Sequence, residues 1–273
     1  MAKPIKIREV WNSNLMFELQ LISNVIRDFS YISMDTEFPG VIFKADFKQN
    51  KFKNPNYLDD HYKLLKANVD SLNLIQLGLT LSDVDGNLPD FGGSERFIWQ
   101  FNFCDFDPAH DPHAPDSIEL LARQGIDFDL NRIYGVDSRA FAYFMLASGV
   151  VCNKSITWVT FHSAYDFAYL VKILTRRPLP GSVRDFLAVT RWFFGDNVYD
   201  LKHLLRFVEG GGLYGGLERV AATVDVRREA GKSHQAGSDS LLTWQAFQKI
   251  RDLYFLKGGA AKHAGVLFGL EVS

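Results

Sequence analysis

The chain has 273 residues, 47% of them hydrophobic and 14% aromatic, so it is long and apolar enough to bury a full core. Its formal net charge of −2 argues against a protein that binds nucleic acid over a broad basic face. It does not exclude binding of nucleic acid in a narrow groove that contains bound cations. No uninterrupted run reaches the roughly 18 apolar residues of a membrane span, so none is predicted.

The cysteine content indicates a reducing compartment. Cys104 and Cys152 form no CxxC pair and no disulfide framework. The opening residues, MAKPIKIREVWNSN, have no apolar run typical of a signal peptide. We therefore expect a cytoplasmic protein with no membrane contact, and the nucleus is left open as a second location.

Helices and strands alternate in the first half of the chain. Asn14 can cap a helix over 15–29, where apolar residues recur at helical spacing. The stretch YISMDTEF at 31–38 is typical of a strand, and the lysine-rich segment that follows it has the character of a solvated loop. Further predicted elements are a helix over 57–72, strands over 73–83 and 96–103, and helices over 117–125 and 139–151.

The second half is mainly helical. A β-rich run at 156–161 precedes predicted helices over 162–174, 182–194, 199–208 and 240–256. Strands are thus concentrated early and helices late. This order predicts an α/β or α+β fold with a central mixed sheet flanked by helices.

An acid pair stands out in the strand at 31–38. Asp35 and Glu37 are two positions apart, so their side chains point to the same face, away from Met34 and Thr36. Two like charges about 5 Å apart repel by roughly 1 kcal/mol in water and by more at a partly buried site. A divalent cation would offset that cost.

Other candidate groups come from distant parts of the chain. Asp166 opens a helix after the strand at 156–161, and Asp239 opens the last long helix, with His234 five residues before it. Each has a purely structural alternative. Asp166 can complete a capping box with Ser163, Asp239 can complement a helix dipole, and a histidine in a loop is often simply solvated.

Taken together, the four carboxylates and the histidine predict a metal-dependent hydrolase. Hard oxygen ligands suit Mg²⁺ or Mn²⁺, and four carboxylates can hold two such ions for displacement at phosphorus. Asp35 is the candidate bridge between the ions. The ring of His234 can take a proton from the attacking water without binding metal.

The same residues lie in longer motifs that resemble a known family. MDTEFPG, VTFHSAYDFAYLVKIL, YDLKHLL and HQAGSDSLLT are similar to segments of the CAF/Pop-type deadenylases, which are catalytic subunits of the CCR–NOT complex within the DEDDh exonuclease superfamily. The resemblance extends from about Ile7 to Phe255. The loop at 105–117 and the glycine-rich stretch at 210–224 depart from the family pattern, which leaves local partner and substrate contacts in doubt.

The resemblance implies an RNase H-like fold, with a mixed central sheet flanked by many helices, in a single exonuclease domain over 1–273. It implies 3′-to-5′ hydrolysis of mRNA poly(A) tails with release of AMP. Two Mg²⁺ or Mn²⁺ ions would be bound by the four acids, and His234 would activate water. The site residues that match the family motifs are Asp35, Glu37, Asp166, His234 and Asp239.

Substrate and partner contacts are less defined. Phe38 and Phe43, just after the acid pair, are candidates for stacking on bases of single-stranded poly(A). The resemblance also implies docking onto the scaffold subunit of the CCR–NOT complex and onto a second deadenylase. Two alternatives stay open: another DEDDh nuclease acting on structured RNA or DNA, and an adaptor without activity.

Overall fold

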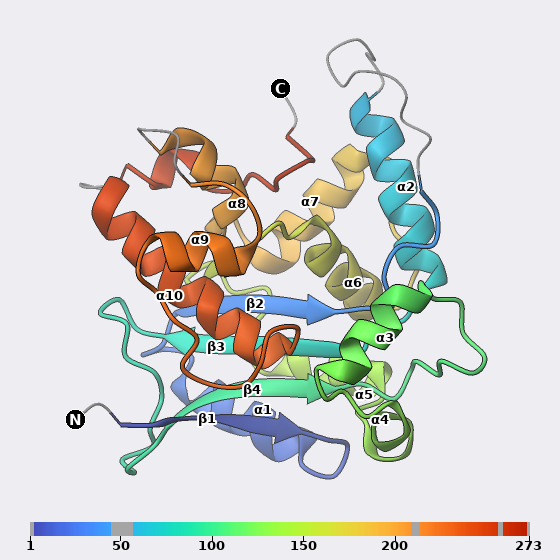
Figure 1. Ribbon diagram of the computed structural model, residues 1–273, viewed down its shortest axis with the longest axis horizontal. Coiled ribbons are helices and arrows are strands. Elements are labelled where there is room, and N and C mark those ends of the chain that lie inside the picture. Colours follow the sequence, from blue (N-terminus) through green and yellow to red (C-terminus); the bar gives the residue numbers. More distant parts are fainter. Residues whose placement is uncertain (1–2, 45–56, 209–212, 256–258, 272–273) are drawn as a thin grey trace.

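A six-stranded mixed sheet forms the centre of the computed structural model, which describes residues 3–44, 57–208, 213–255 and 259–271 (Figure 1). Its order is β1-β4-β3-β2-β5-β6. The pairs β1/β4, β2/β5 and β5/β6 are parallel, whereas β2/β3 and β3/β4 are antiparallel. The strands are β1 (Ile5–Val10), β2 (Tyr31–Glu37), β3 (Gln76–Ser82), β4 (Arg96–Asn102), β5 (Thr157–Thr160) and β6 (Val198–Asp200).

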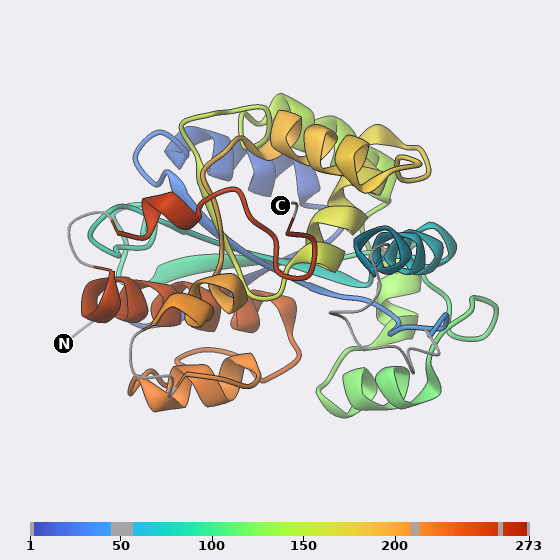
Figure 2. The same ribbon diagram turned by 90° about the horizontal axis from the view of Figure 1, so that it is seen from above.

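Helices cover both faces of the sheet, so the expected mixed sheet between helices is confirmed (Figure 2). One hydrophobic core packs α1, α2, α5, α6 and α7 on one face, and a second packs α8, α9 and α10 on the other. Within the described segments, no helix is both long and apolar enough to cross a bilayer. The helices are α1 (Leu15–Val25), α2 (Tyr57–Ser71), α3 (Pro115–Arg123), α4 (Phe128–Tyr134), α5 (Ser138–Ala147), α6 (Ala164–Thr175), α7 (Val183–Phe194), α8 (Leu201–Leu204), α9 (Leu217–Thr223) and α10 (Ala236–Tyr254).

Strand β2 lies near the middle of the sheet and alternates between the two cores. Met34 is buried in the core that contains α6. Tyr31 faces the other side, where its ring lies 5.2 Å from that of Trp244 on α10. Because alternate residues of a strand share a face, Asp35 and Glu37 point to the same side as α10.

The first turn of α10 lies directly on the sheet. A Cβ atom at Gly78 of β3 would come within 1.8 Å of the carbonyl oxygen of Ala236, so the contact requires glycine. The first main-chain N–H groups of α10 have no acceptor within the helix. Two buried side chains of the strands accept hydrogen bonds from them. Gly237 N donates to Gln100 Oε1 at 3.0 Å, and Ala236 N donates to Gln76 Oε1 at 3.4 Å. The sheet thereby fixes the N-terminus of α10.

Two local expectations need correction, some elements were missed, and one expectation lies partly outside the described residues. The helix predicted over 199–208 begins with strand β6, which extends the sheet beside β5, and helix α8 starts only at Leu201. Asn14 does not cap α1, because its Oδ1 accepts from Trp11 N at 2.8 Å instead. Strand β1 and helices α4 and α9 were not predicted. Part of the lysine-rich loop, residues 45–56, lies outside the described residues.

Candidate active site

The acid pair of β2 lies at the C-terminal end of that strand. In the antiparallel register Asp35 is opposite Gly78 and Glu37 is opposite Gln76. Asp35 is partly exposed and Glu37 is nearly buried, with 9% of its surface accessible. Because Gly78 has no side chain, the first turn of α10 can lie directly on β3 next to Asp35.

Asp166 reaches the same strand end from α6. Its Oδ1 accepts a hydrogen bond of 2.7 Å from Thr36 Oγ1, the residue between the two acids of β2. The capping box with Ser163 is absent, because the Ser163 hydroxyl donates to Asp200 Oδ2 at 3.2 Å and makes no cap bond to α6. The capping alternative for Asp166 is therefore wrong. The hydrogen bond from Thr36 holds the Asp166 carboxylate against β2.

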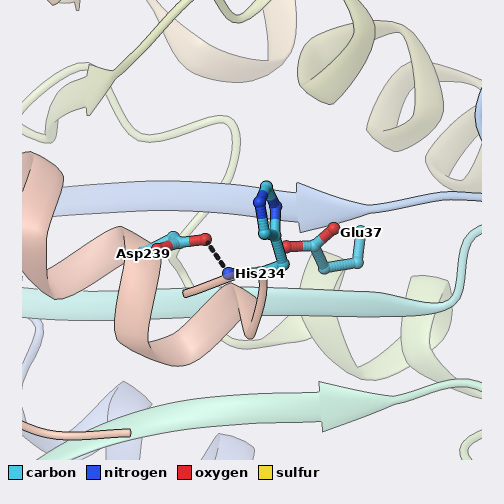
Figure 3. A group of neighbouring side chains, drawn as sticks. All are labelled: Glu37, His234 and Asp239. Carbon is cyan, nitrogen blue, oxygen red and sulfur yellow. Dashed lines mark hydrogen bonds between the residues drawn. The ribbon is translucent and has the colours of Figure 1, made fainter. Parts of the chain in front are cut away.

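Asp239 and His234 approach from the start of α10. His234 has a left-handed backbone, with φ of 57°, and its main-chain N–H donates to Asp239 Oδ2 at 2.8 Å. The ring of His234 is exposed. One ligand atom from each of Glu37, His234 and Asp239 lies within 4.8 Å of the others. Figure 3 shows the three residues side by side. Strand β2 and the start of α10 thus present these three groups to a common point.

The four carboxylates perturb one another. Burial raises the pKa of Asp35 and that of Glu37 well above their usual ranges, and repulsion from Asp239 and Asp166 adds to both shifts. Burial also raises the pKa of Asp166 to about 7, against the opposing hydrogen bond from Thr36. The pKa of Asp239 is raised by burial, although its ion pair with Arg228 opposes the shift.

This electrostatic arrangement fits a divalent cation. Raised carboxylate pKa values show that the folded protein disfavours their accumulated negative charge, and a cation would remove that penalty. Oxygen donors of this kind match the preference of Mg²⁺ and Mn²⁺. Among the described residues, Glu37, His234 and Asp239 form the group compact enough to share one ion, and Asp35 and Asp166 adjoin it as charged neighbours.

The two phenylalanines proposed to contact substrate differ in surroundings. The ring of Phe38 stacks on that of Tyr165 at 5.2 Å and lies 5.1 Å from that of Tyr169, so it is largely engaged within the protein. Phe43 is 44% exposed, and buried Asn68 fixes its backbone by accepting from Phe43 N at 2.9 Å. Phe43 is the better placed of the two for stacking.

Three residues around the acids were missed in the sequence. Thr36 orients Asp166, Gly78 admits α10, and Arg228 contacts Asp239. A glycine inside a strand does signal close backbone approach, so Gly78 could have been found. Arg228 carries no such signal, since the surrounding VRREAGK is typical of a solvated surface segment.

Comparisons with known proteins place these features in context. The family model described as CAF1 family ribonuclease matches residues 10–137. The probable CCR4-associated factor 1 homolog 7 of Arabidopsis thaliana is 48% identical over 271 residues, which cover 98% of this chain and 94% of that protein. The poly(A) ribonuclease pop2 of Schizosaccharomyces pombe is 42% identical, with 97% of this chain and 75% of that protein covered.

Two solved structures have the same overall architecture. The S. pombe Pop2p structure in its Mg²⁺- and Mn²⁺-bound form matches with a TM-score of 0.85 at 42% identity, covering 97% of this chain and 99% of that chain. The CAF1 chain co-crystallised with the yeast NOT1 MIF4G domain matches with a TM-score of 0.78 at 32% identity, covering 96% of each chain.

Proposed function

Because the chain belongs to the CAF1 family of ribonucleases, we propose that it shortens mRNA poly(A) tails from the 3′ end and releases AMP. The observation that carries this proposal is the meeting of acids from three elements, β2, α6 and α10, beside the exposed ring of His234. The similarity to a poly(A) ribonuclease over nearly the whole chain supports adenosine as the substrate base. A catalytically inactive adaptor would not need a cluster of buried acids whose mutual repulsion destabilises the fold.

Asp35, Glu37, Asp166 and Asp239 would hold two Mg²⁺ or Mn²⁺ ions, and the similarity to metal-bound Pop2p supports this cofactor. When bound, such ions make water more acidic and offset charge on the leaving oxygen. The chain's own acids keep the RNA phosphates at a distance until their charge is compensated. Repulsion from each of the other three acids helps to raise the pKa of Asp35, so Asp35 would be the acid that contacts both ions.

His234 would act as the general base. Its ring is exposed beside Glu37 and Asp239, so it can accept a proton from a water molecule directed at the terminal phosphate. The water oxygen bonds to phosphorus as the bond from phosphorus to the 3′ oxygen breaks. The products are AMP and an RNA with a new 3′ hydroxyl. Glu37 would either bind the cation near the water or orient the terminal nucleotide.

The decisive experiment is digestion of oligo(A) by the purified protein with Mg²⁺, with Mn²⁺ and with EDTA. We expect stepwise shortening with either metal and none with EDTA. The Asp35→Ala variant should fold normally and lose activity. Trimming at the normal rate by this variant would contradict the site, and equal degradation of oligo(U) or single-stranded DNA would favour another type of DEDDh nuclease.

A scaffold partner is supported by the similarity to CAF1 in its NOT1 MIF4G complex. We propose that the scaffold docks on α1 and α5, which pack against each other on the face of the sheet opposite α10 (Figure 2). Their outer surface exposes Met16, Phe17, Tyr143 and Leu146 at 44–70% of their area. Leu146→Glu should abolish co-purification with a NOT1 MIF4G domain while oligo(A) digestion continues. Unchanged co-purification would exclude this surface.

Three further expectations remain predictions. A second deadenylase subunit should co-purify with the assembled complex. Residues 1–273 should melt in one cooperative transition, as a single exonuclease domain does. Imaging of the tagged protein should show it in the cytoplasm, with or without a nuclear pool.

A further inference from the structure

One basic side chain reaches the acid cluster. Among the described residues, the hydrogen bonds and ion pairs of the four acids include a single cationic side chain, that of Arg228. It lies in the segment between α9 and α10, and Nη2 donates to Asp239 Oδ1 at 2.5 Å. Only 15% of the Arg228 side chain is exposed, so this contact is largely shielded from solvent.

The guanidinium group of Arg228 joins three parts of the chain. Nη1 donates to the hydroxyl of Ser238 in α10 and to the carbonyl oxygen of Lys232, the latter at 3.3 Å. Nε donates to Glu218 Oε1 of α9 at 3.2 Å, and Nη2 also contacts that oxygen. A planar group with five fixed N–H donors can make these contacts at once, whereas a lysine ammonium concentrates its donors at one point.

The consequence for Asp239 is a fixed carboxylate. Arg228 occupies one lone pair of Oδ1, and the main-chain N–H of His234 occupies one of Oδ2. Each carboxylate oxygen has a second lone pair, so both can still face a cation. Held at both oxygens, the group has little freedom to rotate, and a ligand that is already oriented loses less entropy when it binds.

We infer that Arg228 is a positioning residue of the candidate metal site, which holds the Asp239 carboxylate in its ligating orientation. This inference rests on the proposed function, because it assigns Arg228 a role toward the cations of that site. Arg228 acts through Asp239 and needs no contact with RNA. Its forked shape, and not its charge alone, is what the role requires.

The test compares Arg228→Lys and Arg228→Gln with the wild type. Mn²⁺ affinity is measured by calorimetry without RNA, and kcat and KM are measured on oligo(A). Both variants should bind Mn²⁺ about 10- to 100-fold more weakly, as is typical when a residue supporting a metal ligand is lost. At a fixed, subsaturating Mn²⁺ concentration kcat should fall, and added Mn²⁺ should restore part of it, while KM for oligo(A) should stay within about twofold.

Arg227 provides the matched control. It is the neighbouring residue and is exposed, so Arg227→Lys and Arg227→Gln make the same changes in charge without touching Asp239. These controls should bind Mn²⁺ as the wild type does. Melting curves recorded in EDTA establish that each variant is folded. If Arg228→Gln does not fold, the Mn²⁺ affinity and kinetics of the charge-preserving Arg228→Lys variant decide the test.

Two results would overturn the inference. Wild-type Mn²⁺ affinity in Arg228→Lys would mean that charge alone suffices. A raised KM with unchanged Mn²⁺ affinity would make Arg228 an RNA contact. Failure of the proposed function is distinguishable, because the wild type itself would then neither bind Mn²⁺ nor shorten oligo(A).

Discussion

Asp35 on β2 lies directly opposite Gly78 on β3, and the first turn of α10 rests on that glycine. The strand register therefore brings the helix that carries Asp239 over the strand that carries Asp35. Burial and repulsion from Asp239 both raise the pKa of Asp35, which reflects how close the two carboxylates are. The geometry of the acid cluster depends on the absence of one side chain.

Gly78→Ala should strongly reduce the activity of the enzyme. The added Cβ would lie 1.8 Å from Ala236 O and 2.4 Å from Gly237 N, so α10 must shift and carry Asp239 with it. A displacement of about 1 Å in a catalytic group can reduce the rate about 100-fold. We expect a loss of that size in kcat on oligo(A), together with a lower Tm.

Gly181→Ala is the control for Gly78→Ala, because a Cβ there meets no atom within 4 Å and the backbone needs no glycine. It should leave kcat and Tm unchanged. Normal activity of Gly78→Ala would show that α10 does not depend on this close contact.

Asp166→Asn should stabilise the metal-free protein at alkaline pH. Burial raises the pKa of Asp166 to about 7, from about 3.9 for an aspartate in an unfolded chain. The stability that this group contributes is therefore fully present below about pH 4 and is lost as pH rises through about 7. In EDTA the wild-type Tm should fall across that window. An asparagine side chain cannot ionise, so the variant should fall less and melt about 3 °C higher at about pH 8.

The measurement for Asp166→Asn is a series of melting curves in EDTA across the pH range. Asp129→Asn is the matched control, because Asp129 lies on the surface of α4 with 87% of its side chain exposed. The control should follow the wild type at every pH. An identical pH dependence in Asp166→Asn and the wild type would show that Asp166 is not the group responsible. The variant should be inactive at all pH values.

His234→Asn should separate proton transfer from metal binding. Asparagine tolerates the left-handed backbone at this position and keeps the main-chain N–H that Asp239 accepts. If the ring is the general base, kcat should fall about 100-fold or more while Mn²⁺ affinity stays within about threefold of the wild type. His110→Asn, which alters an exposed loop histidine, should change neither. A parallel loss of Mn²⁺ affinity would identify the ring as a ligand instead.

Phe43→Ala should weaken RNA binding with little effect on stability. Its ring is 44% exposed, and stacking on one base contributes about 1–3 kcal/mol, so we expect roughly tenfold weaker binding of a short oligo(A). Phe38→Ala should instead lower stability by about 2 kcal/mol, because the Phe38 ring packs against two tyrosines of α6. Phe17→Ala, on the far face in α1, is the binding control. Fluorescence titration of labelled oligo(A) and denaturant unfolding are the two measurements.

Much of the fold could be predicted from the sequence. Apolar spacing located α2, α6 and α10, and the strand prediction at 31–38 coincides with β2 almost to the residue. The family resemblance and the mixed sheet between helices are confirmed. Strand β1 was missed because the apolar–charged alternation of IKIREV lasts only four residues before Glu9, next to Arg8, interrupts it, and β6 because three residues are too few to show a period.

The candidate site was only partly predictable. The five groups taken from the family motifs stay predictions until variants are assayed, although three of them lie within 4.8 Å of one another. The glycine inside the strand at 76–82 signals a close backbone approach, but which helix approaches Gly78 depends on strand register and could not be read from the chain. The contacts of Arg228 depend on how α9 and α10 pack and leave no signal in the sequence. Thr36 bonds to a residue 130 positions away, which no local pattern encodes.

The docking of α10 on Gly78 also bears on when activity can begin. Asp35 and Glu37 leave the ribosome about 200 residues before Asp239 during translation. A nascent chain whose α10 has not yet emerged has three of the four acids and an uncovered sheet. It should therefore be unable to cut RNA until α10 has emerged and packed on the sheet.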